Sequence, residues 1–451
     1  MDKPTIILAT SNGIGMGHLA RACAIAEELK AVANPILVSV AGGIADVPST
    51  MGIRCEYIPG KTRRWMPAHR WDAYLRDRLV ALVQETDASV ISFDGVVPYP
   101  GFIATKLKWP SLSIVWVRRG LWQKNILRFA LPLQSRLMDQ IIEPGDIARS
   151  YDRGPTSQRT DARLTSPVSL FKKGTALSRS DARALLNLDP NRPAVLVQLG
   201  AGDADMNEKM TAALKGLIGW DQLQVVLTKD PVNSEGVSLV PTGLDVRVIR
   251  HFPLARVLAA FDGALAATGY NSVHELLPAQ IPTVFISNIR GTDDQDARAK
   301  WCHNFGYALR ADHSDLDHIT ETVALLQRED VRSALVSKCV ELSNTNGGSE
   351  IAQILLALAS GNSKKSNIGG TIFRWVAVSG IHWATYVYRL LRPHKLTTTP
   401  DHSETLFSSE TDAQFLRDSI KGNHRFEHLV ADASTEYLVR RKEIAAKAYG
   451  K

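Results

Sequence analysis

The chain alternates short apolar segments with amphipathic helical stretches, and it repeats this alternation in two series. The first series holds the apolar runs TIILAT (5–10), PILVSVA (35–41), SVISFD (89–94) and SLSIVWV (111–117), with a helical stretch at 18–31. Apolar strands that alternate with helices are typical of a parallel sheet covered by helices on both faces. The order of these segments therefore predicts an α/β fold.

A second series of the same kind begins at AVLVQLGAG (194–202) and continues through four more apolar runs. The segment at 150–175 is polar and rich in Pro, Gly and Ser, which indicates a linker between two units. We expect a Rossmann-like domain at 1–165, a second one at 166–360 that ends in a helix near 349–359, and a partly helical extension at 361–451.

The length, charge and cysteine pattern narrow the classes of partner. The 451 residues suit two domains with a tail, and the formal net charge of +7 favours anionic partners such as phosphorylated substrates or acidic lipid headgroups. No zinc-finger spacing or aromatic RNA-binding motif supports nucleic acid. The four cysteines lack metal-ligand spacing, and neither a signal peptide nor an apolar run of about 18 residues is found. We therefore expect a cytoplasmic protein.

The extension contains an aromatic and basic segment at 371–395. It is too interrupted to span a bilayer, but it has the composition of a segment that lies in the membrane interface. That interpretation would place the protein at the inner face of the cell membrane. The alternative is a helix that docks on the body of the protein.

The loop that follows the first apolar run, SNGIGMGHLAR (11–21), ends in a histidine at the start of a helix. Glycines between a strand and a helix let backbone N–H groups approach a phosphate. A dinucleotide site needs GxGxxG and an acidic residue about 20 positions further on, and the sequence has neither. A turn without a ligand accounts for the glycines, but it accounts less well for His18, whose imidazole can face a cleft.

The second series contains a stretch that brings polar residues to two strand ends, AATGYNSVHELLPAQIPTVFISNIRGTDDQDARA (266–299). The first strand ends at Thr268 and Gly269, and Asn271 or Ser272 is expected to cap the helix that follows. The carboxyl ends of parallel strands collect ligands in folds of this class. We therefore expect a binding site here.

Three acidic residues of this stretch and one glutamine can meet hydroxyl groups at that edge. Glu275, in the first helical turn, can accept hydrogen bonds from a ribose, and the loop with Asp293, Asp294 and Gln295 can meet a sugar. Taken singly, Glu275 also fits a helix-dipole partner, and the two aspartates fit an N-cap pair. The set at this spacing favours a binding site.

These segments resemble the GT-B glycosyltransferases, in particular the branch with the MurG-type N-acetylglucosaminyltransferase and the monogalactosyldiacylglycerol synthases. TGYNSVHELLPAQIPTVFI and DDQDARA follow the donor-binding signature of that branch, with Gln280 in place of a glycine and Arg298 in place of the usual asparagine. The opening loop is also similar to that of the UDP-sugar hydrolases of pseudaminic acid synthesis. The resemblance covers about residues 4–360 and implies two Rossmann-like domains that face a cleft.

The resemblance implies a role for each matching residue. Around the donor diphosphate it places Gly15, Gly17, Gly200, Gly202, Thr268, Gly269, Asn271 and Ser272. Arg21, one helical turn beyond His18, is expected either to assist the phosphates or to lie on a solvated helix face. It places His251 and Phe252 at the uracil, Glu275 at the ribose, and Asp294 and Gln295 at the sugar. The implied activity is transfer of a sugar from a UDP-sugar, with no other cofactor. The alternatives are a hydrolase that releases UDP and a non-catalytic nucleotide-sugar binder.

Inverting sugar transfer needs a base for the acceptor hydroxyl and positive groups for the departing diphosphate. His18 is one candidate base, because an unperturbed imidazole titrates at about pH 6.5. Asp94, at the end of its apolar run, is the other, although an aspartate that starts a turn fits equally well. The acidic runs GDAD (202–205) and TDD (292–294) lie on loops already assigned to the nucleotide sugar rather than to a DxD-type metal site, so we expect a metal-independent reaction.

Arg118, Arg119 and Trp122 combine positive charge with apolar bulk in the first domain. In this fold the first domain takes the acceptor, so we expect these residues to meet a lipid-linked or anionic acceptor of cell-envelope or polysaccharide synthesis. Ordinary packing beside an amphipathic helix at 126–141 is the alternative.

Overall fold

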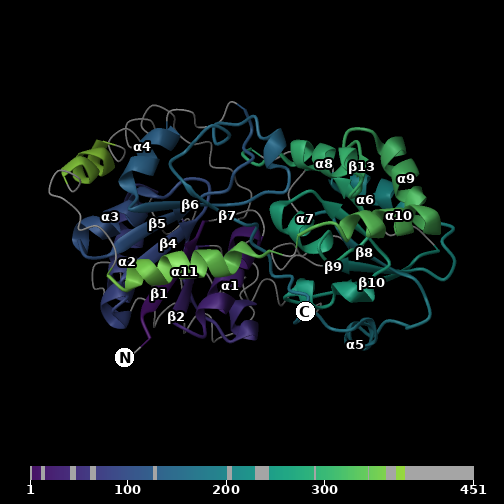
Figure 1. The fold of residues 1–451 in the computed structure, drawn as a ribbon, viewed down its shortest axis with the longest axis horizontal. Coiled ribbons are helices and arrows are strands. Elements are labelled where there is room, and N and C mark those ends of the chain that lie inside the picture. Colours follow the sequence, from purple (N-terminus) through teal and green to yellow (C-terminus); the bar gives the residue numbers. More distant parts are fainter. Residues whose placement is uncertain are drawn as a thin grey trace, which may run out of the picture.

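The computed structural model contains two parallel β-sheets that lie side by side, with helices packed around each (Figure 1). It describes residues 3–11, 16–40, 47–60, 68–124, 130–200, 206–228, 243–288, 291–343, 345–361 and 372–380. Every strand pair in both sheets is parallel. The predicted α/β class with two Rossmann-like domains is therefore confirmed.

The first domain is built on a seven-stranded sheet of order β3-β2-β1-β4-β5-β6-β7. Its strands are β1 (Thr5–Thr10), β2 (Asn34–Ser39), β3 (Arg54–Tyr57), β4 (Val90–Asp94), β5 (Ser113–Val117), β6 (Gln140–Pro144) and β7 (Arg163–Thr165). The helices are α1 (Gly17–Leu29), α2 (Ala68–Thr86), α3 (Pro100–Lys108) and α4 (Ala130–Leu137). Strands β4 and β5 are buried along their whole length, as central strands covered on both faces must be.

The second domain is built on a six-stranded sheet of order β10-β9-β8-β11-β12-β13. Its strands are β8 (Ala194–Gln198), β9 (Gln224–Thr228), β10 (Asp245–Ile249), β11 (Gly263–Ala267), β12 (Thr283–Ile286) and β13 (Leu309–Ala311). Its helices are α5 (Arg179–Leu185), α6 (Met206–Lys215), α7 (Tyr270–Leu276), α8 (Gln295–Asn304), α9 (Leu316–Ala324) and α10 (Glu329–Cys339).

Each sheet has a point where the strand order reverses direction. In the first sheet β1 lies between β2 and β4, and in the second β8 lies between β9 and β11. Ligands of doubly wound sheets bind beyond the carboxyl ends of the strands at such points. The loop before His18 follows β1, and Gly269 follows β11, so both segments singled out in the sequence lie at these positions.

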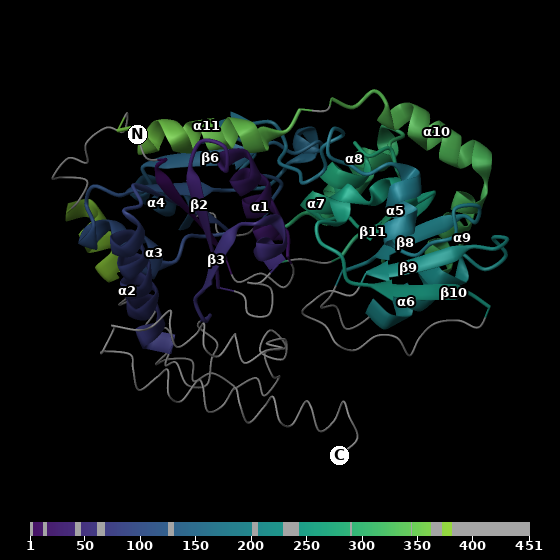
Figure 2. The ribbon, with the colours of Figure 1, turned by 90° about the horizontal axis from the view of Figure 1, so that it is seen from below.

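Helix α11 (Gly347–Ala359) crosses back from the second domain to the first. Its apolar side chains, among them Ile351 and Leu355, pack in one core cluster with Leu19 and Ile25 of α1. Figure 2 shows α11 lying along the first domain beside α1. The sequence interpretation placed this helix in the second unit; the structure places its buried face on the first, where α1 leaves an apolar surface.

Residues 372–380 of the extension form a helix that docks on the first domain. Arg374 donates from Nε to the carbonyl oxygen of Leu137 at 2.9 Å and from Nη2 to Asp139 at 2.6 Å, and Val378 is buried in the domain core. The docked alternative therefore holds for this part of the extension. None of the helices in the described ranges is long and apolar enough to cross a membrane.

Candidate active site

His18 and Asp94 form a hydrogen-bonded pair at the reversal point of the first sheet. His18 lies in the first turn of α1 and Asp94 is the last residue of β4, next to the end of β1. The Nδ1 atom of His18 lies 2.6 Å from Oδ1 of Asp94, and His18 keeps 16% of its side chain exposed. The two residues that the sequence offered as alternative bases are therefore partners in one cluster.

Glycine is required directly after Asp94 because the chain turns there in close contact with its neighbours. A Cβ atom on Gly95 would lie 2.5 Å from the Phe93 ring and 2.7 Å from the Cβ of Ser11. The carbonyl oxygen of Asp94 also accepts a hydrogen bond from the backbone N–H of Ser11 at 2.8 Å. The turn thus fixes the position of Asp94, whose carboxylate contacts His18.

Arg21 completes the cluster from one turn further along α1. It donates to Asp94 from Nε at 2.9 Å and from Nη2 at 2.5 Å, and it is only 4% exposed. Its guanidinium also lies 5.2 Å from the ring centre of Tyr270 in the second domain. We expected Arg21 either at the phosphates or on a solvated helix face; instead it is buried and holds the Asp94 carboxylate.

The surroundings of this cluster set its protonation. Burial lowers the pKa of His18, and the positive charges of Arg21 and Arg119 lower it further against the opposing effect of Asp94. Burial alone would raise the pKa of Asp94, but Arg21 and His18 hold it below its ordinary value. At neutral pH we therefore assign an ionised Asp94 and a neutral His18. The proton on Nδ1 points to Asp94, and Nε2 is the basic nitrogen.

Glu275 lies on α7 of the second domain and is half-buried. Burial raises its pKa to about 8. In the described part of the chain its carboxyl group has no hydrogen-bond or ion-pair partner. A carboxyl group that is partly shielded from water and has no partner is unfavourable in its charged form unless a ligand supplies donors, so this position fits the ribose role that the resemblance implies. Glu275 lies in the second turn of α7, not in the first as expected.

The start of α7 faces the start of α1 across the domain boundary. Gly269 is the N-cap residue and neither Asn271 nor Ser272 caps the helix, contrary to expectation. Asn271 instead donates from Nδ2 to the carbonyl oxygen of Gly17 at 3.1 Å. A Cβ atom on Gly269 would meet only the Ser272 hydroxyl, at 3.9 Å. The structure thus brings Gly17, Gly269 and Ser272 to one place between the domains.

The polar residues predicted for the sugar make contacts inside the protein. Asp294 caps α8 by accepting from the backbone N–H of Ala297, so the N-cap alternative is observed for it. Gln295 is 5% exposed and accepts from the backbone N–H of Asn288 at 3.0 Å. Thr268, which was predicted for the diphosphate, is also fully buried, and its hydroxyl lies 3.3 Å from that of Ser287.

The structure describes some, but not all, of the remaining residues that were predicted to bind the nucleotide sugar. Gly200, after β8, has a φ of 82°, a backbone conformation that favours glycine. His251 is half-buried, and burial together with Arg256 lowers its pKa. Phe252 packs against the core cluster of the first domain rather than standing free. Gly15 and Gly202 lie outside the described residues.

The three residues predicted for the acceptor do not form an exposed patch. Arg118 is fully buried and bonded to Glu143 and Asp161, and Trp122 is 1% exposed. Arg119 keeps 13% of its side chain exposed and pairs with Asp293 of the second domain at 3.1 Å. Burial thus leaves only Arg119 within reach of a ligand in this arrangement.

Four residues with a central place at the domain boundary were not predicted as functional. Tyr270 donates its hydroxyl to the carbonyl oxygen of Gly145, and His274 accepts from the backbone N–H of Ile147 at 3.1 Å. Asp146 and Arg298 form a buried ion pair. The only sequence signal for any of them was that Arg298 departs from the usual asparagine.

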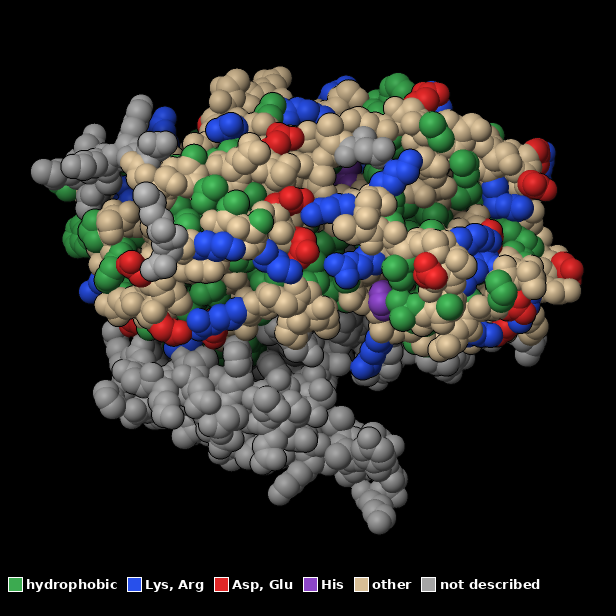
Figure 3. Space-filling model, turned by 60° about the horizontal axis from the view of Figure 1, so that its bottom comes forward, with side chains coloured by type: hydrophobic (Ala, Val, Ile, Leu, Met, Phe, Trp, Pro, Cys, Tyr) green, Lys and Arg blue, Asp and Glu red, His purple; other side chains and the backbone are tan. Residues whose placement is uncertain are grey.

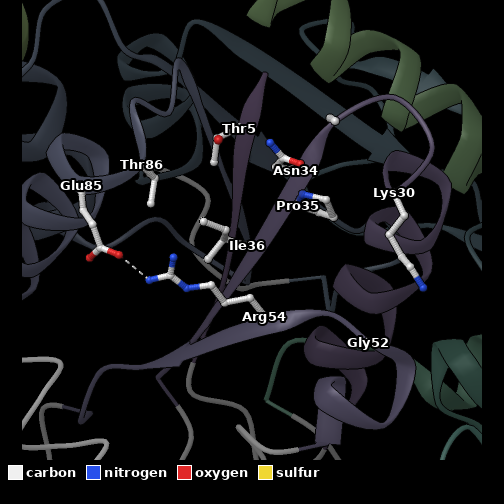
Figure 4. A pocket seen from close by; sticks show the side chains of 10 residues that line it. Thr5, Lys30, Asn34, Pro35, Ile36, Gly52, Arg54, Glu85 and Thr86 are labelled. Carbon is white, nitrogen blue, oxygen red and sulfur yellow. Dashed lines mark hydrogen bonds and ion pairs between the residues drawn. The ribbon is translucent and has the colours of Figure 1, made fainter. Parts of the chain in front are cut away.

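A surface pocket lies at the opposite end of the first sheet (Figure 4). Thr5, Asn34 and Pro35, at the amino ends of β1 and β2, line it, and the ion pair of Arg54 with Glu85 crosses it. Functional sites of this architecture lie at the carboxyl ends instead. Within the described ranges no three His, Cys, Asp or Glu side chains come together as a metal site.

Curated relatives of the chain are all of one kind. A UDP-N-acetylglucosamine–N-acetylmuramyl-(pentapeptide) pyrophosphoryl-undecaprenol N-acetylglucosamine transferase of Rhodococcus jostii is 24% identical over 389 residues, which are 80% of this chain and 98% of that protein. The enzyme of the same name from Frankia casuarinae is 26% identical over 340 residues, 69% of this chain and 84% of its own. No protein-family model matches the sequence.

Solved structures show the same fold. MurG of Acinetobacter baumannii superposes with a TM-score of 0.52 at 15% identity, over 78% of this chain and 99% of its own. A UDP-glucosyltransferase from Polygonum tinctorium gives a TM-score of 0.57 at 14% identity, over 80% and 99% of the two chains. The chain therefore has the GT-B fold, and its resemblance to the MurG-like branch, expected from the sequence, is confirmed.

Proposed function

We propose that this protein is a glycosyltransferase that moves N-acetylglucosamine from UDP-N-acetylglucosamine to a lipid-linked acceptor of the cell envelope. The curated relatives carry out a transfer of this kind by name. One observation of this structure supports the proposal most strongly. The His18–Asp94 pair of the first domain and the α7 helix with the unpartnered Glu275 meet at the boundary where both sheets reverse their strand order.

We propose a single displacement in which His18 acts as the base. Nε2 takes the proton of the acceptor hydroxyl, whose oxygen forms a bond to C1 of the sugar while the bond from C1 to the β-phosphate oxygen of UDP breaks. Attack from the side opposite to UDP inverts the configuration at C1. Asp94 fixes the imidazole through Nδ1 and stabilises the imidazolium that forms, and Arg21 keeps Asp94 ionised.

The departing UDP carries the negative charge that develops in this step. Backbone N–H groups at the start of α7, which no side chain caps, and the exposed part of Arg119 are the positive groups that the boundary offers. Figure 3 shows further Lys and Arg side chains spread over the face of the molecule, with Asp and Glu among them. We therefore propose a reaction that needs neither a metal ion nor a cofactor besides the nucleotide sugar.

We extend the proposal to contact with a lipid surface through the docked helix 372–380. Ile372, Phe373, Trp375 and Val376 are 41–63% exposed and lie on its outer side, while Arg374 and Val378 point to the first domain. Apolar and aromatic side chains that face outward from an anchored helix are typical of interfacial binding. A lipid-linked acceptor would then meet the domain that carries His18.

Release of UDP from UDP-N-acetylglucosamine tests the proposed transfer. The purified protein is incubated with the nucleotide sugar, with and without a polyprenyl-diphosphate-linked N-acetylmuramyl-pentapeptide in detergent. We expect UDP release that depends on the acceptor and a product one N-acetylglucosamine heavier. Full turnover without the acceptor would instead show the hydrolase, and binding without turnover would show the non-catalytic binder.

A further inference from the structure

Arg298 lies in the interior at the domain boundary and joins three separate segments. The side chain is fully buried on α8. Its Nη1 donates to the carbonyl oxygen of Thr268, at the end of β11, at 2.7 Å, and its Nη2 donates to Asp293 at 2.9 Å. Nε and Nη2 donate to Asp146 at 3.1 and 2.9 Å.

The contact between Arg298 and Asp146 crosses from one domain to the other. Asp146 follows β6 of the first domain and its side chain is 3% exposed. Besides Arg298 of its own domain, Asp293 forms an ion pair with Arg119 of the first domain. A backbone bridge also joins Asp293 to Trp122 of the first domain. Two ion pairs between the domains, Arg298 with Asp146 and Arg119 with Asp293, therefore lie beside the segment formed by the loop before α8 and the first residue of that helix.

This segment, residues 291–295, carries the side chains that the resemblance assigns to the donor sugar. Arg298 is thus bonded to the loop for the sugar, to the end of β11 and to the first domain at once. In the resembled branch an asparagine stands at this position, whereas here the longer side chain reaches past the loop into the other domain. Without Arg298, Asp146 would keep the hydrogen bond from the backbone N–H of Ala148 but would be a buried carboxylate without an ion-pair partner, which is strongly unfavourable.

We propose that Arg298 is a positioning residue that sets the sugar-binding loop of the second domain against the first domain. It does not touch the substrate itself. This inference rests on the proposed use of a UDP-sugar and specifies which part of that donor Arg298 controls. The nucleotide half has other candidate contacts, Glu275 and His251, and neither is bonded to Arg298.

The two halves of the donor provide the test. Binding of UDP and of UDP-N-acetylglucosamine to the full chain is measured by calorimetry for the wild type, Arg298→Gln and Asp146→Asn. We expect both variants to bind UDP within about twofold of the wild type. We expect them to bind UDP-N-acetylglucosamine about tenfold more weakly, which is the effect of one misplaced hydrogen bond. Asp146→Asn keeps the contact of Arg298 with Asp293, so it isolates the part that crosses the domains.

Arg183→Gln is the matched control, because Arg183 is an equally buried arginine whose partners all belong to the second domain. It should leave the ratio of the two affinities as in the wild type. If both test variants keep the wild-type ratio of the two affinities, the inference about Arg298 is overturned while the proposed function stands. If the wild type binds neither ligand, the proposed function fails, and the inference fails with it.

Discussion

The Nδ1 atom of His18 and the Oδ1 atom of Asp94 lie 2.6 Å apart although the two residues are 76 positions apart in the chain. The pair forms because α1 is the helix that follows β1 in the chain, and β4 is the neighbour of β1 in the sheet. Arg21 binds the same carboxylate from the next turn of α1. The base and the cation therefore come from the first two turns of α1, and the carboxylate that joins them comes from the end of the adjacent strand β4.

Replacing Asp94 by asparagine should impair the chemical step and leave donor binding in place. The side chain keeps its size, but the charge that fixes the Nδ1 proton and stabilises the imidazolium is lost. We expect kcat for sugar transfer to fall by about 10²–10⁴-fold and the Kd for UDP-N-acetylglucosamine to change little. Asp262→Asn, which alters an ion-paired aspartate of the second domain, is the control. A kcat within about threefold of the wild type would remove Asp94 from the mechanism.

The rate should depend on pH through the neutral form of His18. Burial lowers the pKa of His18 below its ordinary value of 6.5, and the base acts only without its proton. With both substrates saturating, kcat should therefore be level at pH 7 and above and should fall as pH drops through the lowered pKa, below pH 6.5. In Asp94→Asn this decline should move to still lower pH, because Asp94 raises the pKa of His18. A decline centred at pH 7 or higher in the wild type would contradict the assignment.

Binding of UDP should release a proton from Glu275 near neutral pH. Burial raises the pKa of this carboxyl group to about 8 in the free protein, so the group is largely protonated at pH 7. Ribose hydroxyls that donate to it favour the ionised form and lower its pKa. Affinity should therefore rise with pH up to about 8 and level off above it. Calorimetry in buffers of different ionisation enthalpy measures the released proton, which Glu275→Gln should abolish. Proton uptake, or an affinity that is independent of pH, would argue against the ribose role.

The outer side of helix 372–380 should bind lipid. Changing Trp375 and Val376 to serine removes two exposed apolar side chains and leaves Arg374, which anchors the helix, in place. Each large apolar side chain contributes about 1.5–3 kcal/mol on burial, so flotation with anionic vesicles should show a loss of binding of at least about tenfold. Leu185→Ser, at an exposed leucine of the second domain, should bind as the wild type does. Equal flotation of all three proteins would refute the lipid contact.

The sequence was sufficient for the architecture of the two sheets because its signals are local. The apolar run at 5–10 and the glycines before His18 predicted β1 and the start of α1 closely, and the run at 194–202 did the same for β8. The domain that α11 covers could not be predicted in this way. An amphipathic pattern with Ile351 and Leu355 on one side says that this side is buried, but it does not say against which partner.

The sequence predicted which residues belong to the candidate site better than it predicted the contacts that these residues make. His18, Asp94 and Glu275 stood out because each follows or flanks a strand end. The pairing of Arg21 with Asp94 and the burial of Arg118 depend on contacts 73 and 25 positions apart in the chain, which no local pattern reports. The same holds for Arg298, whose partner Asp146 lies 152 positions away.

A single-turnover experiment with His18→Ala tests the central claim most directly. Radiolabelled UDP-N-acetylglucosamine, pre-bound to excess protein, is mixed with the lipid-linked acceptor and quenched after increasing times. The proposed mechanism predicts rapid appearance of labelled lipid with the wild type. With His18→Ala it predicts a rate lower by about 10²-fold or more at unchanged donor affinity. Labelled lipid formed at the wild-type rate by His18→Ala would contradict it.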